Sequence, residues 1–138
     1  MDTSTAQAIV DAMSDAWNRG DAEQFTARFS DDGTFTNIYG MTFVGRQAFR
    51  DRLTGLFQRY SGSTTSMKVR NVRLARPDAA IIDVDCVGEP ISRFPPFTPA
   101  DEKGIVRMHL LMVLVSEGGR WLIAAFHNTA VVPQLQRP

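Results

Sequence analysis

The fold of this chain is decided by three phrases of its sequence: A-W-N-R-G-D at residues 16–21, D-D-G-T-F-T-N-I-Y-G-M-T-F-V-G-R at residues 31–46, and G-R-W-L-I-A-A-F-H-N-T at residues 119–129. Each of these stretches lies where one predicted secondary-structure element packs against or leads into the next. A short amphipathic segment lies between the first two phrases, and strand-like runs lie between the last two. Their order predicts two helices, a strand, a third helix and then a strand meander, which together build a cone with a pocket.

Apolar residues at helical spacing predict the helices. In the first helix, which Thr3 or Ser4 caps and which ends near Gly20, apolar residues recur every three or four positions. Asp21 is expected to cap a second, short helix. A third amphipathic helix is predicted over residues 46–60, where it should lie across a sheet.

Strand and turn signals account for the rest of the chain. A turn at Asp32-Gly33 leads into a strand over residues 34–39. The remaining predicted strands span residues 67–76, 79–87, 104–117 and 120–132, with turns at Pro77-Asp78 and Gly118-Gly119. The proline-rich residues 89–103 are predicted to form a loop, in which Phe94 and Phe97 either close the mouth of the pocket or cover an edge.

The three phrases resemble the nuclear transport factor 2-like superfamily, specifically its SnoaL-like branch and the SgcJ/EcaC family named from natural-product gene clusters. The resemblance covers nearly the whole chain. It implies an α+β fold, in which a cone-shaped, curved mixed or antiparallel β-sheet wraps on three helices of the N-terminal half as a cystatin-like roll. It also implies a single SnoaL-like domain over residues 1–138. A fold by itself does not determine a function.

The composition argues against several classes of partner. The chain has 138 residues, of which 43% are apolar, enough to bury the core of one domain. Its 15 basic and 15 acidic residues balance, so neither nucleic acid nor a membrane surface is expected to bind. Residues 1–7 are polar, unlike a signal peptide, and the longest apolar run is too short to span a bilayer. The single cysteine, Cys86, precludes an internal disulfide. These features predict a soluble, cytoplasmic protein.

The resemblance extends to the ketosteroid isomerases, whose catalytic positions can be compared by an ungapped alignment. The position of their aspartate base corresponds to Asn37, and an amide cannot abstract a proton at neutral pH. Their carbonyl-binding tyrosine and protonated aspartic acid correspond to Met13 and Leu111. The isomerase mechanism in its known form is therefore not expected here.

The same alignment places two other acids, Asp83 and Asp85, on the pocket-facing side of their strand, because alternate residues share one face. Burial beside each other would make one of them a general acid or base. His109 would meet them from the neighbouring strand and complete a proton shuttle. Two alternatives stay open: the aspartates face solvent while their neighbours fill the core, and His109 is a hydrogen-bonded structural residue.

Uncharged polar side chains are predicted to bind the ligand. Asn37 and Asn128 would orient a carbonyl, hydroxyl or quinone oxygen inside an apolar cone, which favours an uncharged, partly polar ligand. A hydrogen bond from Asn128 to the backbone is the alternative. Tyr39 and Trp17 either form aromatic walls of the pocket or pack in the core. Arg107 lies on the same side of its strand as the candidate histidine and would bind an anion.

Neither a metal nor a cofactor is expected. The two histidines, His109 and His127, lie in no metal-binding motif, and no phosphate or nucleotide-binding loop is present. The oxidoreductase activity that the SgcJ/EcaC label suggests therefore has no visible support in the motifs. Residues 104–117 are apolar on both faces, which predicts a homodimer packed through the outer face of the sheet.

Two functions from different classes remain open. One is an enzyme of bacterial secondary metabolism that binds a polyketide-like or aromatic intermediate and performs cofactor-independent proton transfer, such as cyclisation or isomerisation. The other is a non-catalytic, dimeric ligand-binding or assembly protein, in which the same polar side chains recognise a ligand or satisfy one another. The loss of the isomerase base favours the second.

Overall fold

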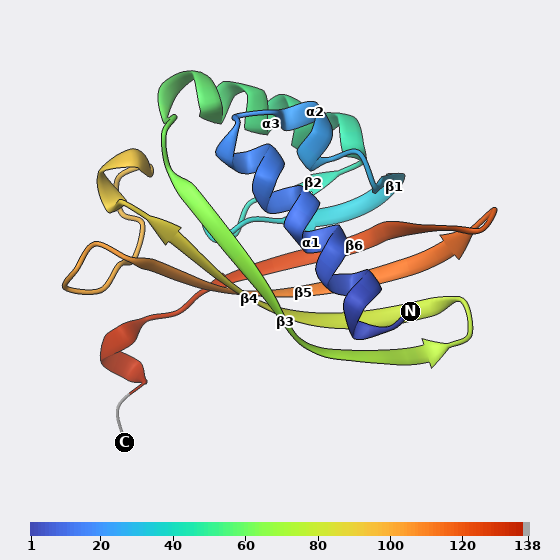
Figure 1. Cartoon of the computed structure of the whole chain (residues 1–138). Helices are drawn as coiled ribbons and strands as arrows, with labels where there is room; N and C mark the ends of the chain where they lie inside the picture. The colour runs from blue at the N-terminus through green and yellow to red at the C-terminus, as the bar shows by residue number, and fades with distance from the viewer. Residues whose placement is uncertain (137–138) are drawn as a thin grey trace.

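A curved six-stranded sheet carries three α-helices on one of its faces in the computed structural model, which describes residues 1–136 (Figure 1). The elements in chain order are α1 (Thr3–Asn18), α2 (Ala22–Phe25), β1 (Phe29–Thr36), β2 (Thr42–Val44), α3 (Arg46–Arg59), β3 (Thr64–Arg76), β4 (Ala79–Glu89), the 3-10 turn η1 (Ile91–Arg93), β5 (Val106–Glu117), β6 (Arg120–Ala130) and the 3-10 turn η2 (Pro133–Leu135). This architecture confirms the predicted α+β fold with a curved sheet and three helices.

The sheet is mixed because its first long strand lies beside its last. The strand order is β2-β1-β6-β5-β4-β3, and β1 runs parallel to β6 while the other neighbours are antiparallel. This pairing brings the end of β1 next to the end of β6. The two asparagines that follow or lie in these strands, Asn37 and Asn128, are thereby carried to the same end of the sheet.

Several predicted boundaries are wrong. The strand predicted over residues 34–39 ends at Thr36, and the strand predicted over residues 67–76 begins at Thr64. The first long strand begins at Phe29 and runs through Asp32-Gly33, which was predicted to be a turn, because β1 pairs with β6 from Phe29 onward through an irregular register. Gly33 approaches β6 so closely that a Cβ there would lie 2.7 Å from the Ala124 carbonyl oxygen. The N-cap of α1 is Asp2, whose carboxylate accepts the Thr5 amide, so the cap lies one residue before the predicted pair.

Two amide side chains of α1 fasten the helix to β3, the edge strand of the sheet. Asn18 accepts the Thr65 amide at 2.7 Å and donates to the carbonyl of the same residue at 3.1 Å. Gln7 donates to the Met67 carbonyl at 2.8 Å and accepts the Val69 amide at 2.9 Å. Backbone groups on the free edge of β3 are therefore satisfied by the helix, which protects that edge from pairing with another chain.

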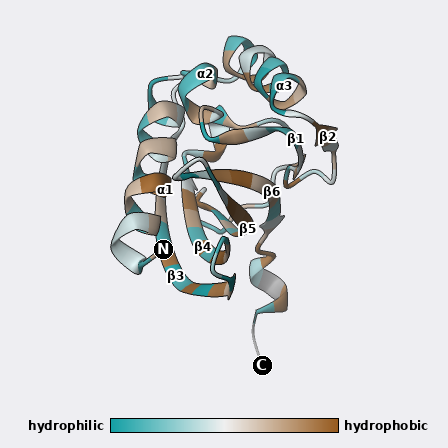
Figure 2. Ribbon diagram, turned by 90° about the vertical axis from the view of Figure 1, so that its right-hand side faces the viewer, coloured by the Kyte–Doolittle hydropathy of each residue, from teal (hydrophilic) through white to brown (hydrophobic). Residues whose placement is uncertain are grey.

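The core lies between the helices and the inner face of the sheet, and its densest part is a group of phenylalanine rings. Phe29 packs against four of them, with ring centroids 4.3 Å from Phe35, 5.5 Å from Phe49, 5.9 Å from Phe126 and 6.0 Å from Phe25. The strands alternate between core-facing and outward residues, which Figure 2 shows as alternating bands along β3. The ring cluster forms one wall of the cavity described next.

Candidate functional site

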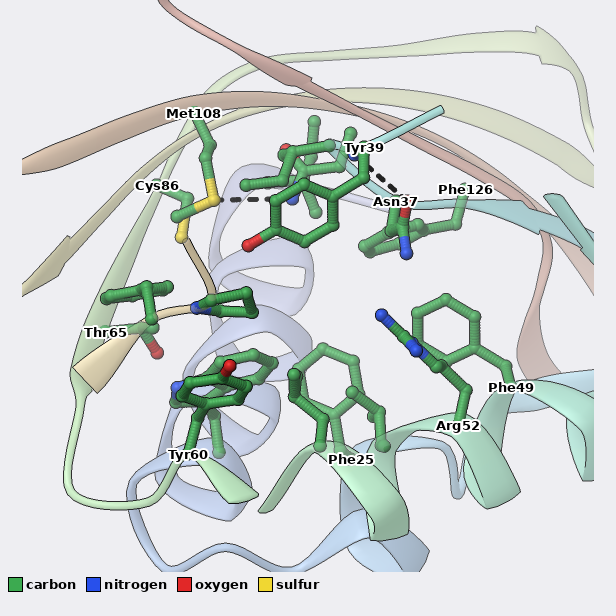
Figure 3. Close-up of a pocket in the computed structure, with 18 of the residues that line it drawn as sticks. Phe25, Asn37, Tyr39, Phe49, Arg52, Tyr60, Thr65, Cys86, Met108 and Phe126 are labelled. Carbon is green, nitrogen blue, oxygen red and sulfur yellow. Dashed lines mark hydrogen bonds between the residues drawn. The ribbon is translucent and has the colours of Figure 1, made fainter. Parts of the chain in front are cut away.

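A cavity of about 80 Å³ opens between the inner face of the sheet and the helices (Figure 3). Most of its lining is apolar and comes from elements that are far apart in the chain, including Trp17 of α1, Cys86 of β4, Met108 of β5 and Phe126 of β6. The Trp17 indole packs edge-on to its aromatic neighbours and donates its N–H to the Ser63 hydroxyl at 2.9 Å. Trp17 thus lines the cavity and also packs against the core, so its position agrees with both of the alternatives given above.

Asn37 supplies a hydrogen-bond donor to this cavity. It follows β1, where its side-chain oxygen accepts the backbone amides of Tyr39 and Met41, each at 3.0 Å, and so closes the turn that leads to β2. The oxygen is therefore committed to the backbone. The amide nitrogen points into the cavity (Figure 3).

Asn128 supplies an acceptor that has no partner. Its position on β6 places it in the cavity lining, opposite Leu110 of β5. The side-chain nitrogen donates to the Met108 sulfur at 3.5 Å, and the side-chain oxygen is buried without any hydrogen bond to the described residues. An unsatisfied buried acceptor costs about 1–3 kcal/mol. The predicted alternative, a hydrogen bond from Asn128 to the backbone, is therefore not what the structure shows.

Tyr39 holds the proline-rich loop over the cavity. The Thr98 hydroxyl donates to the Pro95 carbonyl at 2.6 Å, so it accepts the Tyr39 hydroxyl proton at 2.7 Å. Phe94 and Pro95 consequently line the cavity, whereas Phe97 is fully exposed. The loop covers the cavity mouth through Phe94, and Phe97 takes no part in it.

Two arginines of the lining were missed by sequence reasoning. Arg52 of α3 and Arg93 of η1 both contribute to the cavity wall. The signal for Arg52 was present in the sequence, because it stands three residues after Phe49 and one before Leu53, within the apolar stripe of its helix. Arg93 lies in the proline-rich segment and carries no periodic signal.

The described residues that line the cavity include no aspartate, glutamate or histidine. These are the side chains that most often act as general bases near neutral pH. Cys86 is 2% exposed, and burial raises the pKa of its thiol to about 12, so the thiol stays protonated. Partial burial also raises the pKa of the Tyr39 phenol above its usual value. The cavity is consequently a mainly apolar chamber whose lining also includes two asparagines and two arginines.

The predicted catalytic residues meet one another, but on the other face of the sheet. His109 lies between both acids, with Nδ1 3.2 Å from an Asp85 oxygen and Nε2 3.4 Å from an Asp83 oxygen. Their neighbours along β4 and β5 are buried in the core, so these three side chains point outward. The expected contact between the strands is therefore present, and the expected pocket-facing placement is wrong. The alternative, in which neighbouring residues fill the core, describes the structure.

Arg107 is also on the outer face. It is exposed, and its guanidinium lies 3.8 Å from an Asp101 oxygen. It does not contribute to the cavity lining, so the placement predicted for it as a ligand-binding residue is wrong. His127 is exposed on the same face, as the register of β6 predicts.

Within residues 1–136, no group of three or more histidine, cysteine, aspartate or glutamate side chains is arranged to hold a metal ion. No helix in this range is both long and apolar enough to cross a bilayer.

Comparison with known proteins identifies a domain family. The family model described as "SnoaL-like domain" matches residues 10–123, whereas no curated protein shows a significant match to the chain. A domain of unknown function with a cystatin-like fold from Nostoc punctiforme is 25% identical in sequence, with a TM-score of 0.78, and the match covers 96% of this chain and 80% of that domain. An uncharacterized protein with the same fold from Caulobacter vibrioides is 24% identical, with a TM-score of 0.80 and coverage of 97% and 92%. A ketosteroid isomerase-like protein from Erwinia carotovora atroseptica is 18% identical, with a TM-score of 0.73 and coverage of 95% and 97%, a likeness of fold alone.

Proposed function

Because this chain belongs to the SnoaL-like domain family, we propose that it binds a small molecule with an aromatic body in the cavity of its cone. The observation that carries this proposal is a mainly apolar chamber whose lining includes Asn128, a residue with a buried side-chain oxygen that has no hydrogen-bond partner among residues 1–136. Burial of a polar atom in such a place is unfavourable unless something hydrogen-bonds to it. A ligand with a hydroxyl or N–H group at one end of its ring satisfies it.

The size of the cavity limits the ligand. At about 80 Å³ it exceeds what one water needs. It is smaller than an engineered apolar cavity of roughly 150 Å³ that binds benzene. The enclosed part is therefore too small to hold a whole ring, and an aromatic ligand must extend partly through the mouth beside Tyr39. The polyketide-like or aromatic intermediate of bacterial secondary metabolism predicted from the sequence would have to bind in this way.

Binding without chemistry has more support than proton transfer. Cofactor-independent isomerisation or cyclisation requires a group that accepts a proton from the bound ligand. His109, Asp83 and Asp85, the residues proposed for this step, lie on the outer face, where they pair with one another and Asp85 also faces Arg70 at 3.4 Å. We therefore propose that the protein recognises its ligand, and that the outer cluster serves the surface on which it lies.

Asn128→Leu tests the site because leucine has nearly the same size and no acceptor. Phenol, which can donate to the Asn128 oxygen, is expected to bind the variant about 5-fold more weakly. Toluene, which cannot donate, is expected to bind it equally well or better. Both affinities are measured by NMR titration of the two tryptophan indole N–H signals. Trp17 lines the cavity and Trp121 does not, so a ligand in the cavity shifts only the first signal.

His127→Leu is the matched control, since this neighbouring residue points to the opposite face and is exposed. It is expected to leave both affinities unchanged. If neither phenol nor toluene shifts the Trp17 signal of the folded wild-type protein, the cavity is not a binding site and the proposal fails.

We also propose that a second copy of the chain covers the outer face of the sheet. All three α-helices lie on the inner face (Figure 1), which leaves the outer face of β4 and β5 uncovered. This face presents apolar side chains, among them Leu111 at 43% exposure, around charged groups of both signs that include Asp85 and Arg70. A face that carries both signs of charge among apolar groups can complement itself about a two-fold axis.

Leu111→Arg is expected to raise the dissociation constant of this dimer by about 10-fold or more, because burial of leucine is lost and two like charges approach each other. Sedimentation velocity over a concentration series measures the effect. Ala12→Arg, on the exposed side of α1, is the control and should not change the association. A wild-type protein that sediments as a monomer at every concentration would contradict the dimer.

A further inference from the structure

Arg52 is a partly buried arginine of α3 that has no acidic partner among the described residues, in contrast to Arg46 and Arg50 of the same helix. Arg46 lies 3.4 Å from an Asp31 oxygen, and Arg50 lies 2.6 Å from a Glu23 oxygen. Among the described residues no carboxylate lies within 4 Å of the Arg52 guanidinium, although this side chain is partly buried. A partly buried cation without a counter-charge is unfavourable, and a bound anion would relieve it.

The Arg52 side chain points into the cavity, so the anion is expected to bind there. Figure 3 shows its guanidinium pointing into the chamber, toward the region that the Asn37 amide nitrogen also faces. The Asn37 oxygen is held by two backbone amides, so only the donor end of that side chain is presented. Both groups can only donate here. A ligand group that accepts several hydrogen bonds fits between them.

The remaining charges around the cavity favour the same sign. Arg93 is a second cation of the lining, and it too has no carboxylate within 4 Å among residues 1–136. No acidic side chain of the described residues lines the chamber. A site lined by charges of one sign with low-dielectric walls attracts the opposite charge. The chain as a whole is neutral, so this preference arises from the local arrangement.

We infer that the ligand is a small aromatic carboxylate, whose ring enters the apolar chamber and whose carboxylate group binds Arg52 and the Asn37 amide nitrogen, with Arg93 at longer range. A guanidinium offers two parallel N–H groups that match the two oxygens of a carboxylate. This inference rests on the proposed ligand-binding function and makes its ligand class specific. It differs from the uncharged ligand that the two asparagines alone suggested.

Matched acids and amides test the charge of the ligand. Phenylacetate is compared with phenylacetamide, and indole-3-acetate with indole-3-acetamide, using the Trp17 indole N–H signal as the readout and the Trp121 signal as the internal reference. The wild-type protein is expected to bind each acid about 10-fold or more tightly than its amide. Raising the salt concentration should weaken binding of the acids and leave that of the amides unchanged.

Arg52→Gln is expected to remove the preference for the acids while the amides bind as before. Arg50→Gln is the matched control, because it makes the same change of charge on the same helix at a residue that pairs with Glu23 and does not line the cavity. It should retain the preference. Arg52→Lys keeps the charge without the paired N–H groups and should retain part of it.

The outcomes separate the two proposals. Equal binding of acids and amides to the wild-type protein, or an unchanged preference in Arg52→Gln, would overturn the carboxylate while leaving the cavity as a ligand site. Tighter binding of phenyl phosphate than of either acid would also overturn it in favour of a phosphate ester. No shift of the Trp17 signal with any compound would overturn the ligand-binding function and this inference with it.

Discussion

Replacing Phe29 with alanine is expected to lower the free energy of unfolding by about 3–5 kcal/mol. Phe29 is 2% exposed, and its ring packs against four other phenylalanine rings in the densest part of the core. Alanine would leave a void that these rings cannot close without leaving their own positions. Urea denaturation followed by circular dichroism measures the change, from the midpoint and slope of the transition.

Phe97→Ala is the control for this prediction. It makes the same substitution at a side chain that is fully exposed, so the unfolding free energy should change by less than about 0.5 kcal/mol. A loss below about 1 kcal/mol for Phe29→Ala would show that the ring cluster does not stabilise the fold as described. Because Phe49 and Phe126 belong both to this cluster and to the cavity lining, the variant should also weaken binding of toluene.

The double variant Gln7→Ala and Asn18→Ala removes the four side-chain hydrogen bonds between α1 and β3. It is expected to lower the free energy of unfolding by about 2–4 kcal/mol, because each bond is worth about 0.5–1.5 kcal/mol and water replaces some of them. The backbone amides of Thr65 and Val69 should then exchange with solvent faster, because Asn18 and Gln7 accept their hydrogen bonds. Urea denaturation gives the stability, and hydrogen exchange detected by NMR gives the local effect.

The two single variants make the second prediction specific. Asn18→Ala should accelerate exchange at the Thr65 amide and spare Val69, and Gln7→Ala should do the reverse. Asn71→Ala, an exposed asparagine on the same strand, is the control for loss of an amide and should leave both unchanged. Equal exchange at both amides in all variants would mean that α1 does not protect the edge of β3.

The spacing of apolar residues predicted the helices and strands, because it reflects which side of each element packs against the core. This spacing is set within each segment and does not depend on residues far away in the chain. The helix predicted over residues 46–60 matches α3 (Arg46–Arg59), and Asp21 caps α2 as expected. The start of β1 was missed because Asp32-Gly33 has the composition of a turn. Parallel pairing with β6, a contact between distant parts of the chain, keeps this segment extended.

The faces of β4 and β5 could not be obtained from an ungapped alignment, because a shift of one residue moves every side chain of a strand to the other face. β3 contains two register irregularities before β4 begins. Leu111, which was aligned with a pocket residue of the isomerases, is 43% exposed, and its neighbours Leu110 and Met112 are buried instead. The same shift turned the Asp83, Asp85 and His109 cluster away from the cavity while preserving the contacts within it.

The sequence by itself determined the order of the elements, because short-range periodicity specifies them, and its resemblance to a known family indicated the cone. The same resemblance placed Asn37 and Asn128 in the cavity wall, where the structure also has them. Only the tertiary structure decided which charges the cavity contains. Whether Arg52 has an acidic partner, and whether the Asn128 oxygen has a donor, depends on every residue that packs around them. Such neighbours come from distant parts of the chain, and no local pattern reports their absence.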